Sequence, residues 1–86
     1  MRIGPILSYL PLMDRQTALR HLRKAERHVA EGAARIAECE RSVAELERNG
    51  RDATDAKELL KTLLKSQLLR ERNLEIFRAE LADLDT

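Results

Sequence analysis

A heptad repeat of apolar residues constrains this chain more than any other feature of its sequence. Along the first half, two interleaved series recur every seven residues, one aliphatic and one mostly small: Leu22, Val29, Ile36, Val43 and Ala18, Ala25, Gly32, Cys39, Leu46. Such a repeat is typical of an α-helix that packs one face against another helix, as in a coiled coil. The small residues leave space for large side chains on the partner helix.

The second half of the chain supplies those large side chains. Its two corresponding series are Leu60, Gln67, Leu74, Leu81 and Ala56, Leu63, Arg70, Phe77, Leu84. The segment 49–51 between the halves is so short that the two helices must run antiparallel as neighbours. Folding about it pairs a small or β-branched residue with a large one in nearly every layer, for example Gly32 with Gln67, Cys39 with Leu60 and Ala25 with Leu74.

Polar residues and glycine mark the ends of both helices. Asp14 is suited to cap a helix over about residues 15–48, and Gly50 to end it in the left-handed conformation. Asp52 is suited to cap a second helix over about residues 53–83, and Asp55 adds favourable charge to its first turn. We therefore expect an all-α fold, in which residues 14–86 form an antiparallel two-helix coiled-coil hairpin.

Composition and charge limit the cellular setting. Lys and Arg total 16 and Asp and Glu total 15, so the net charge of +1 gives no long-range attraction to nucleic acid or to an acidic surface. The single cysteine excludes an intramolecular disulfide and a multi-cysteine zinc site, and it favours the reducing cytoplasm. A membrane span needs about 20 apolar residues, and the longest uncharged run, residues 3–13, is much shorter.

The first 13 residues form an apolar segment broken by Gly4, Pro5 and Pro11. One interpretation is a flexible or docking arm that covers part of the hairpin or latches onto a partner. The other is an extension upstream of the true start of the protein, because Met13 directly precedes the predicted helix cap at Asp14. Both interpretations stay open at this point.

Five large apolar residues of the second helix do not fit the seam between the helices: Leu59, Leu64, Leu68, Leu69 and Ile76. Leu59, Leu64 and Leu68 widen the apolar face of this helix, whereas Leu69 and Ile76 lie on nearly the opposite side. Isolated exposed leucines mean little, but a connected apolar patch usually marks an interface. A lone two-helix hairpin is also marginally stable. We therefore expect a homodimer that forms a four-helix bundle, or binding to another helical protein, as the function of a non-enzymatic interaction module.

Two polar residues, Gln67 and Arg70, interrupt the apolar face of the second helix. A polar residue in a seam lowers stability but fixes the register of the helices. Gly32 gives the Gln67 side chain room, and Arg70 is expected to carry its charge outward to Glu26 or Glu31. We therefore assign both residues a register-setting role.

A basic stripe on the outer face of the first helix suggests an alternative function. Its members are Arg20, Arg23, Lys24 and Arg27. Clustered cations can neutralise phosphates, and such binding weakens steeply as salt rises. However, no aromatic residue is interleaved for stacking, and acidic residues of the second helix are expected alongside to form ion pairs. A nucleic-acid accessory role is therefore the second hypothesis.

No residue pattern indicates catalysis, a cofactor or a metal. His21 and His28 are two helical turns apart, about 10.5 Å, which is too far to chelate one ion, so we expect them to pair with nearby acids. His21 and Lys24 resemble the His-x-x-Lys-Gly stretch of histidine phosphotransfer domains, but Ala25 stands in place of the glycine. Cys39 in the seam is expected to act as a small buried hydrophobe.

Two short elements, Val29-Ala30-Glu31-Gly32 and Gly50-Arg51-Asp52-Ala53-Thr54-Asp55-Ala56, carry a family resemblance. Over about residues 25–82 the chain resembles a group of very small helical proteins of α-proteobacteria, of the rhizobial kind, whose function is not known. The resemblance implies a bacterial, cytoplasmic protein. It implies no activity, cofactor or binding residue.

Overall fold

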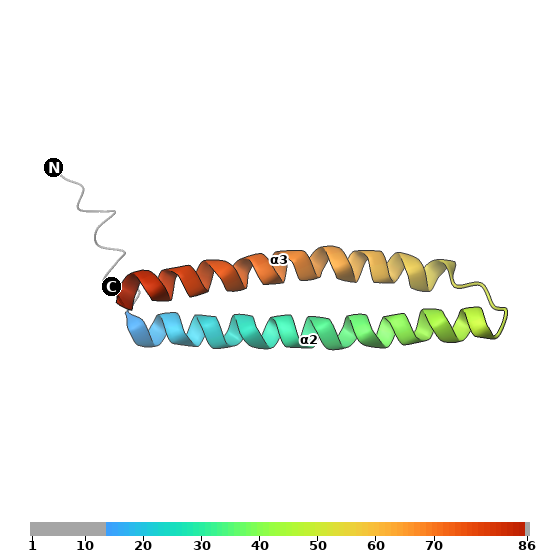
Figure 1. Ribbon diagram of the computed structural model, residues 1–86, viewed down its shortest axis with the longest axis horizontal. Coiled ribbons are helices and arrows are strands. Elements are labelled where there is room, and N and C mark those ends of the chain that lie inside the picture. The colour runs from blue at the N-terminus through green and yellow to red at the C-terminus, as the bar shows by residue number, and fades with distance from the viewer. Residues whose placement is uncertain (1–13, 86) are drawn as a thin grey trace.

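The computed structural model describes residues 14–85, which form an antiparallel hairpin of two long helices (Figure 1). Helix α2 covers Arg15–Arg48 and helix α3 covers Thr54–Asp85, and the two lie side by side along their length. The predicted hairpin is confirmed. Helix α2 has the predicted bounds, whereas α3 begins at Thr54 rather than Ala53 and continues to Asp85. The predicted apolar arm, residues 1–13, lies outside the described residues.

Helix α2 begins at a capping aspartate, as predicted. The Asp14 carboxylate accepts a hydrogen bond of 2.7 Å from the backbone N–H of Thr17. The Asp14 carbonyl accepts the first helical bond, from the N–H of Ala18 at 2.9 Å. The side chain thus satisfies one of the donors that the first turn of a helix leaves free.

Helix α2 ends at Arg48, and Gly50 follows as the left-handed residue that was predicted to stop it. The φ angle of Gly50 is 68°, a left-handed conformation that glycine adopts without steric cost. Its N–H donates to the Glu47 carbonyl at 3.1 Å, and the N–H of Arg51 donates to the Leu46 carbonyl at 2.8 Å. These two nested bonds form a Schellman motif, which closes the helix and directs the chain back towards α3.

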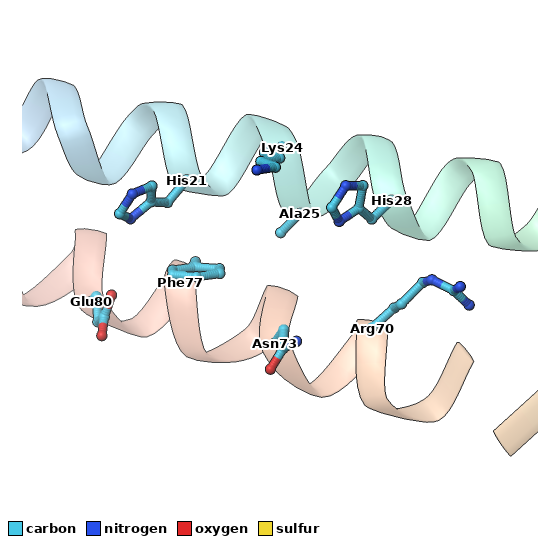
Figure 2. Close-up of a pocket in the computed structure, with 8 residues that line it drawn as sticks. All are labelled: His21, Lys24, Ala25, His28, Arg70, Asn73, Phe77 and Glu80. Carbon is cyan, nitrogen blue, oxygen red and sulfur yellow. The ribbon is translucent and has the colours of Figure 1, made fainter. Parts of the chain in front are cut away.

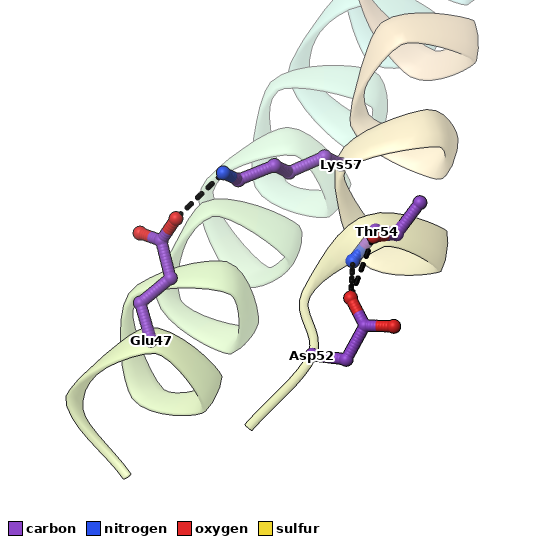
Figure 3. A network of polar contacts seen from close by, with 4 residues as sticks. All are labelled: Glu47, Asp52, Thr54 and Lys57. Atoms are coloured by element: carbon purple, nitrogen blue, oxygen red, sulfur yellow. Dashed lines mark hydrogen bonds and ion pairs between the residues drawn. The ribbon is translucent and has the colours of Figure 1, made fainter. Parts of the chain in front are cut away.

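Helix α3 is held at its start by Asp52 and Lys57 (Figure 3). The Asp52 carboxylate accepts from the N–H of Thr54 at 2.9 Å and from the Thr54 hydroxyl at 2.6 Å. The first helical bond runs to the Ala53 carbonyl, so Asp52 caps from one residue further out than predicted. Lys57 Nζ lies 2.7 Å from Glu47 Oε2 and ties the two helices together, and this contact raises the pKa of Lys57.

The two capping aspartates should make the stability of the hairpin fall in acid. The backbone N–H of Thr17 lowers the pKa of Asp14 below 3.8, and the Thr54 hydroxyl and N–H do the same for the pKa of Asp52. The unfolded chain therefore takes up these two protons at a higher pH than the folded chain. The contribution of the charged caps is complete above pH 3.8 and is lost as the pH falls through the lower folded pKa values.

The double variant Asp14→Asn/Asp52→Asn tests this, because asparagine also caps helices but does not titrate. Its melting temperature, followed by circular dichroism, should fall less than that of the unaltered chain between neutral pH and about pH 3. An equal fall in both proteins would contradict the prediction.

The core follows the predicted seam. The small series of α2 is buried at Ala18, Ala25, Gly32 and Cys39, and Gln67 and Leu74 are buried on α3. The aliphatic series of α2 is half-buried. Among the described residues no large side chain is fully enclosed, so the hairpin has a thin core, as two helices alone must.

Contacts between distant parts of the chain fix the register. Near the middle, the amide Nε2 of Gln67 donates to the carbonyl of Val29 at 2.8 Å, and a Cβ atom on Gly32 would lie 2.9 Å from Cδ of Gln67. Near the open end, Arg15 Nε lies 2.8 Å from Asp85 Oδ1. The predicted pairing of Gly32 with Gln67 is therefore confirmed.

Candidate functional site

Three shallow grooves follow one side of the hairpin. Each groove is lined by two residues of a series that is seven apart and so lies on one line along α2: His21, His28, Arg35 and Ser42. The groove nearest the turn is lined by Cys39, Leu59 and Leu63 as well, and the middle one by Glu31 and Arg70. All three are open to solvent along the hairpin.

One of these grooves lies towards the open end of the hairpin and has a volume of about 390 Å³ (Figure 2). The His21 ring packs against Phe77 across the seam, with ring centroids 5.4 Å apart and a tilt of 55°. Lys24 and Arg70 bring positive charge to the lining and Glu80 brings negative charge. Sequence reasoning missed this groove, because its shape depends on the side-chain conformations of both helices.

The histidines in this groove lack the acid partners expected for them. Within residues 14–85 no hydrogen bond or ion pair joins His21 or His28 to a carboxylate, so that prediction is wrong. His21 Nδ1 and Glu80 Oε1 are both buried without a hydrogen-bond partner. His21 is half-buried, and its ring packs against Phe77.

The two polar seam residues behave differently from each other. Gln67 is 7% exposed and bonds to the α2 backbone, which supports a register role, although its Oε1 atom has no partner. Arg70 forms no ion pair with Glu26 or Glu31 among the described residues, so that expectation is wrong. Its guanidinium lies over Gly32, with Nη1 3.2 Å from where a Cβ atom would be.

The four residues of the basic stripe, Arg20, Arg23, Lys24 and Arg27, are all exposed on α2. In the part of the chain that the structure describes, none of them pairs with an acid, contrary to expectation. Arg20 instead donates to the Thr17 hydroxyl at 3.3 Å. The ion pair at that end of the hairpin uses Arg15 and Asp85.

Cys39 is a buried structural residue, as predicted. It is 8% exposed, and its Sγ atom donates to the Ala56 carbonyl at 3.4 Å. In the described range 14–85, no three His, Cys, Asp or Glu side chains gather where they could hold a metal ion. Neither of the two helices is long and apolar enough to cross a membrane.

The predicted interface residues are exposed, and all of them lie on α3. Their exposed fractions are 53% for Leu59, 46% for Leu64, 63% for Leu68, 60% for Leu69 and 48% for Ile76. Leu64 and Leu68 lie on the side of the hairpin that carries the Lys57–Glu47 ion pair, because Leu64 follows Lys57 by one heptad. Leu59 lines a groove on the other side, and Leu69 and Ile76 lie beyond it on the outer surface.

The other helix differs: among the described residues no exposed large apolar side chain comes from α2. This asymmetry makes the exposed apolar surface of α3 the candidate functional site. No protein-family model, curated protein or solved structure matches the chain.

Proposed function

We propose that this protein is a non-enzymatic helical interaction module that associates through the exposed apolar surface of α3. The observation that carries the proposal is the exposure of five large apolar side chains on that helix, between 46% and 63% each: Leu59, Leu64, Leu68, Leu69 and Ile76. Leu64 and Leu68 lie on one side of α3 and the other three on the opposite side, and exposed apolar surface of this extent is typical of interaction sites.

The thin core of the hairpin gives association a second consequence. Each 100 Å² of apolar surface removed from water contributes roughly 2.5 kcal/mol. No large side chain within residues 14–85 is fully enclosed, so a partner that covers α3 adds burial that the hairpin alone lacks. Because the partner binds the folded state, it also stabilises the fold by mass action.

Molar mass in solution tests the proposal. Light scattering after size exclusion should give at least a dimer mass for residues 1–86 and for residues 13–86. A variant with glutamine at the five exposed apolar positions should stay helical and give a monomer mass. A monomer mass for both unaltered chains at about 100 μM, well above typical interface Kd values, would overturn self-association.

A control variant carries five glutamines on the outer face of α2 instead, at Arg20, Arg27, Ala34, Arg41 and Arg48, which are all exposed. It should keep the mass of the unaltered chain, because those positions lie away from α3. Association of residues 1–86 but not of residues 13–86 would transfer the contact to the first 12 residues and overturn the assignment to α3.

A further inference from the structure

One line of exposed side chains on α3 has a charge pattern that inverts about its centre. The line consists of two lysines, two leucines and two glutamates: Lys57, Lys61, Leu64, Leu68, Glu71 and Glu75. Their spacing alternates between four and three residues, which keeps all of them on one side of the helix. From here on, "the stripe" means this line on α3, which is distinct from the basic stripe of α2.

The ion pair between Lys57 and Glu47 places the stripe beside α2, on the side of the seam opposite the grooves. Two heptads before Glu47, the same side of α2 carries Ala33, and Ala37 follows one turn later. These side chains are small, so a second helix can approach the two leucines closely. Leu64 and Leu68 are 46% and 63% exposed there.

The order of the charges along the stripe matches a second copy of this chain in the antiparallel direction. In a symmetric pair, each contact occurs twice with the roles exchanged. If Leu64 faces Leu68 of the partner subunit in an antiparallel pair, Lys61 faces Glu71 of the partner subunit. One step further out, Lys57 faces Glu75 of the partner subunit. A parallel pair would instead place lysine against lysine and glutamate against glutamate.

We propose that two copies of this chain pair through the stripe, with their α3 helices antiparallel and Leu64 of each against Leu68 of the other. The proposal rests on the proposed function, for which it names the partner, the face and the register. The leucines supply the affinity, since exposed ion pairs contribute little to it. The charges supply the orientation, since like charges placed opposite each other repel.

Charge reversal tests the register. The variants Lys57→Glu/Lys61→Glu and Glu71→Lys/Glu75→Lys each give a stripe whose charged residues share one sign. Each should raise the dimer Kd at least about 10-fold, by repulsion in the symmetric pair. An equimolar mixture of the two should recover the dimer mass, because every lysine then meets a glutamate.

The control variant Lys65→Glu/Arg72→Glu makes the same change in net charge as Lys57→Glu/Lys61→Glu, at exposed positions outside the stripe. It should dimerise like the unaltered chain. Lys57→Glu/Lys61→Glu also breaks two ion pairs, that of Lys57 with Glu47 and that of Lys61 with Glu58. Glu71→Lys/Glu75→Lys breaks none that the structure describes, so it carries the test if the first variant loses helicity.

A disulfide tests the orientation separately. In a Cys39→Ala background, a mixture of the Lys61→Cys and Glu71→Cys chains should form a crosslink between the two chains. Neither variant alone should form a crosslink between two of its own copies. In the antiparallel pair, the same position in the two copies is separated by ten residues of helix, about 15 Å. A dimer that forms the self-crosslinks instead would overturn the antiparallel arrangement.

The outcomes separate this proposal from the proposed function. Dimers that survive both charge reversals would overturn the register but leave association through α3 intact. A monomer mass for the unaltered chain would overturn both.

Discussion

Replacing Leu74 by alanine is expected to remove most of the helical structure of the free hairpin. Leu74 is 8% exposed, and it is the only large aliphatic side chain that is buried within residues 14–85. In the register that pairs Gly32 with Gln67, its layer contains Ala25, which is 6% exposed and too small to fill the space that the substitution would leave. Truncation of a buried leucine typically costs about 2–5 kcal/mol.

A loss of about 2 kcal/mol or more is a large fraction of what so thin a core provides. Circular dichroism at 222 nm during urea unfolding measures this loss of stability. The Leu74→Ala chain should lose most of its signal, or show a midpoint well below that of the unaltered chain.

The matched control is Leu69→Ala, the same substitution on the same helix at a side chain that is 60% exposed. At a protein concentration too low for association, a change at this exposed position should alter the stability of the free hairpin by less than about 0.5 kcal/mol. Equal losses for the two variants would contradict the burial that the hairpin shows. A Leu69→Ala loss that grows with protein concentration would instead indicate that an associated copy covers Leu69.

The seam was predictable from the sequence because periodicity and turn chemistry agreed. The heptad series of α2 predicted that Ala18, Ala25, Gly32 and Cys39 face the seam, and these are the buried residues of that helix. The register then followed from the position of Gly50, whose left-handed φ of 68° fixes where the chain reverses. A short antiparallel connection leaves only one pairing that keeps both apolar faces together.

The end of the seam departs from the repeat for a local reason. Leu84 continues the apolar series of α3 but is 39% exposed. The layer it should join contains Arg15, the first residue of α2, and Arg15 forms an ion pair with Asp85. No large apolar side chain of α2 is therefore available there to cover Leu84.

Side-chain partners across the seam were much less predictable. We expected Arg70 to pair with Glu26 or Glu31, and the two histidines to pair with nearby acids, yet none of these pairings forms among the described residues. Long polar side chains have several conformations of similar energy, and position on the heptad does not choose among them. The charge order of the stripe was present in the sequence, but its meaning depends on knowing that the side chains at its centre are exposed.

The layer of Gly32 and Gln67 offers the sharpest test of how the two helices fit together. A Cβ atom on Gly32 would collide with Oε1 of Gln67, whose amide bonds to the Val29 carbonyl. Gly32→Leu should therefore destabilise the hairpin by about 1–3 kcal/mol through overpacking and loss of that bond. The gain in helix propensity on replacing glycine, up to about 1 kcal/mol, reduces the loss but does not cancel it.

The double variant Gly32→Leu/Gln67→Ala exchanges the large and the small residue of the layer. It should recover at least about 1 kcal/mol relative to the sum of the two single changes, because the leucine then occupies the space that Gln67 vacates. Urea unfolding of all four chains in the cycle gives this coupling energy, and Ala34→Leu, at an exposed position of α2, controls for an added leucine on that helix. A coupling energy near zero would mean that Gly32 and Gln67 do not share a layer, and the register of the hairpin would then be wrong.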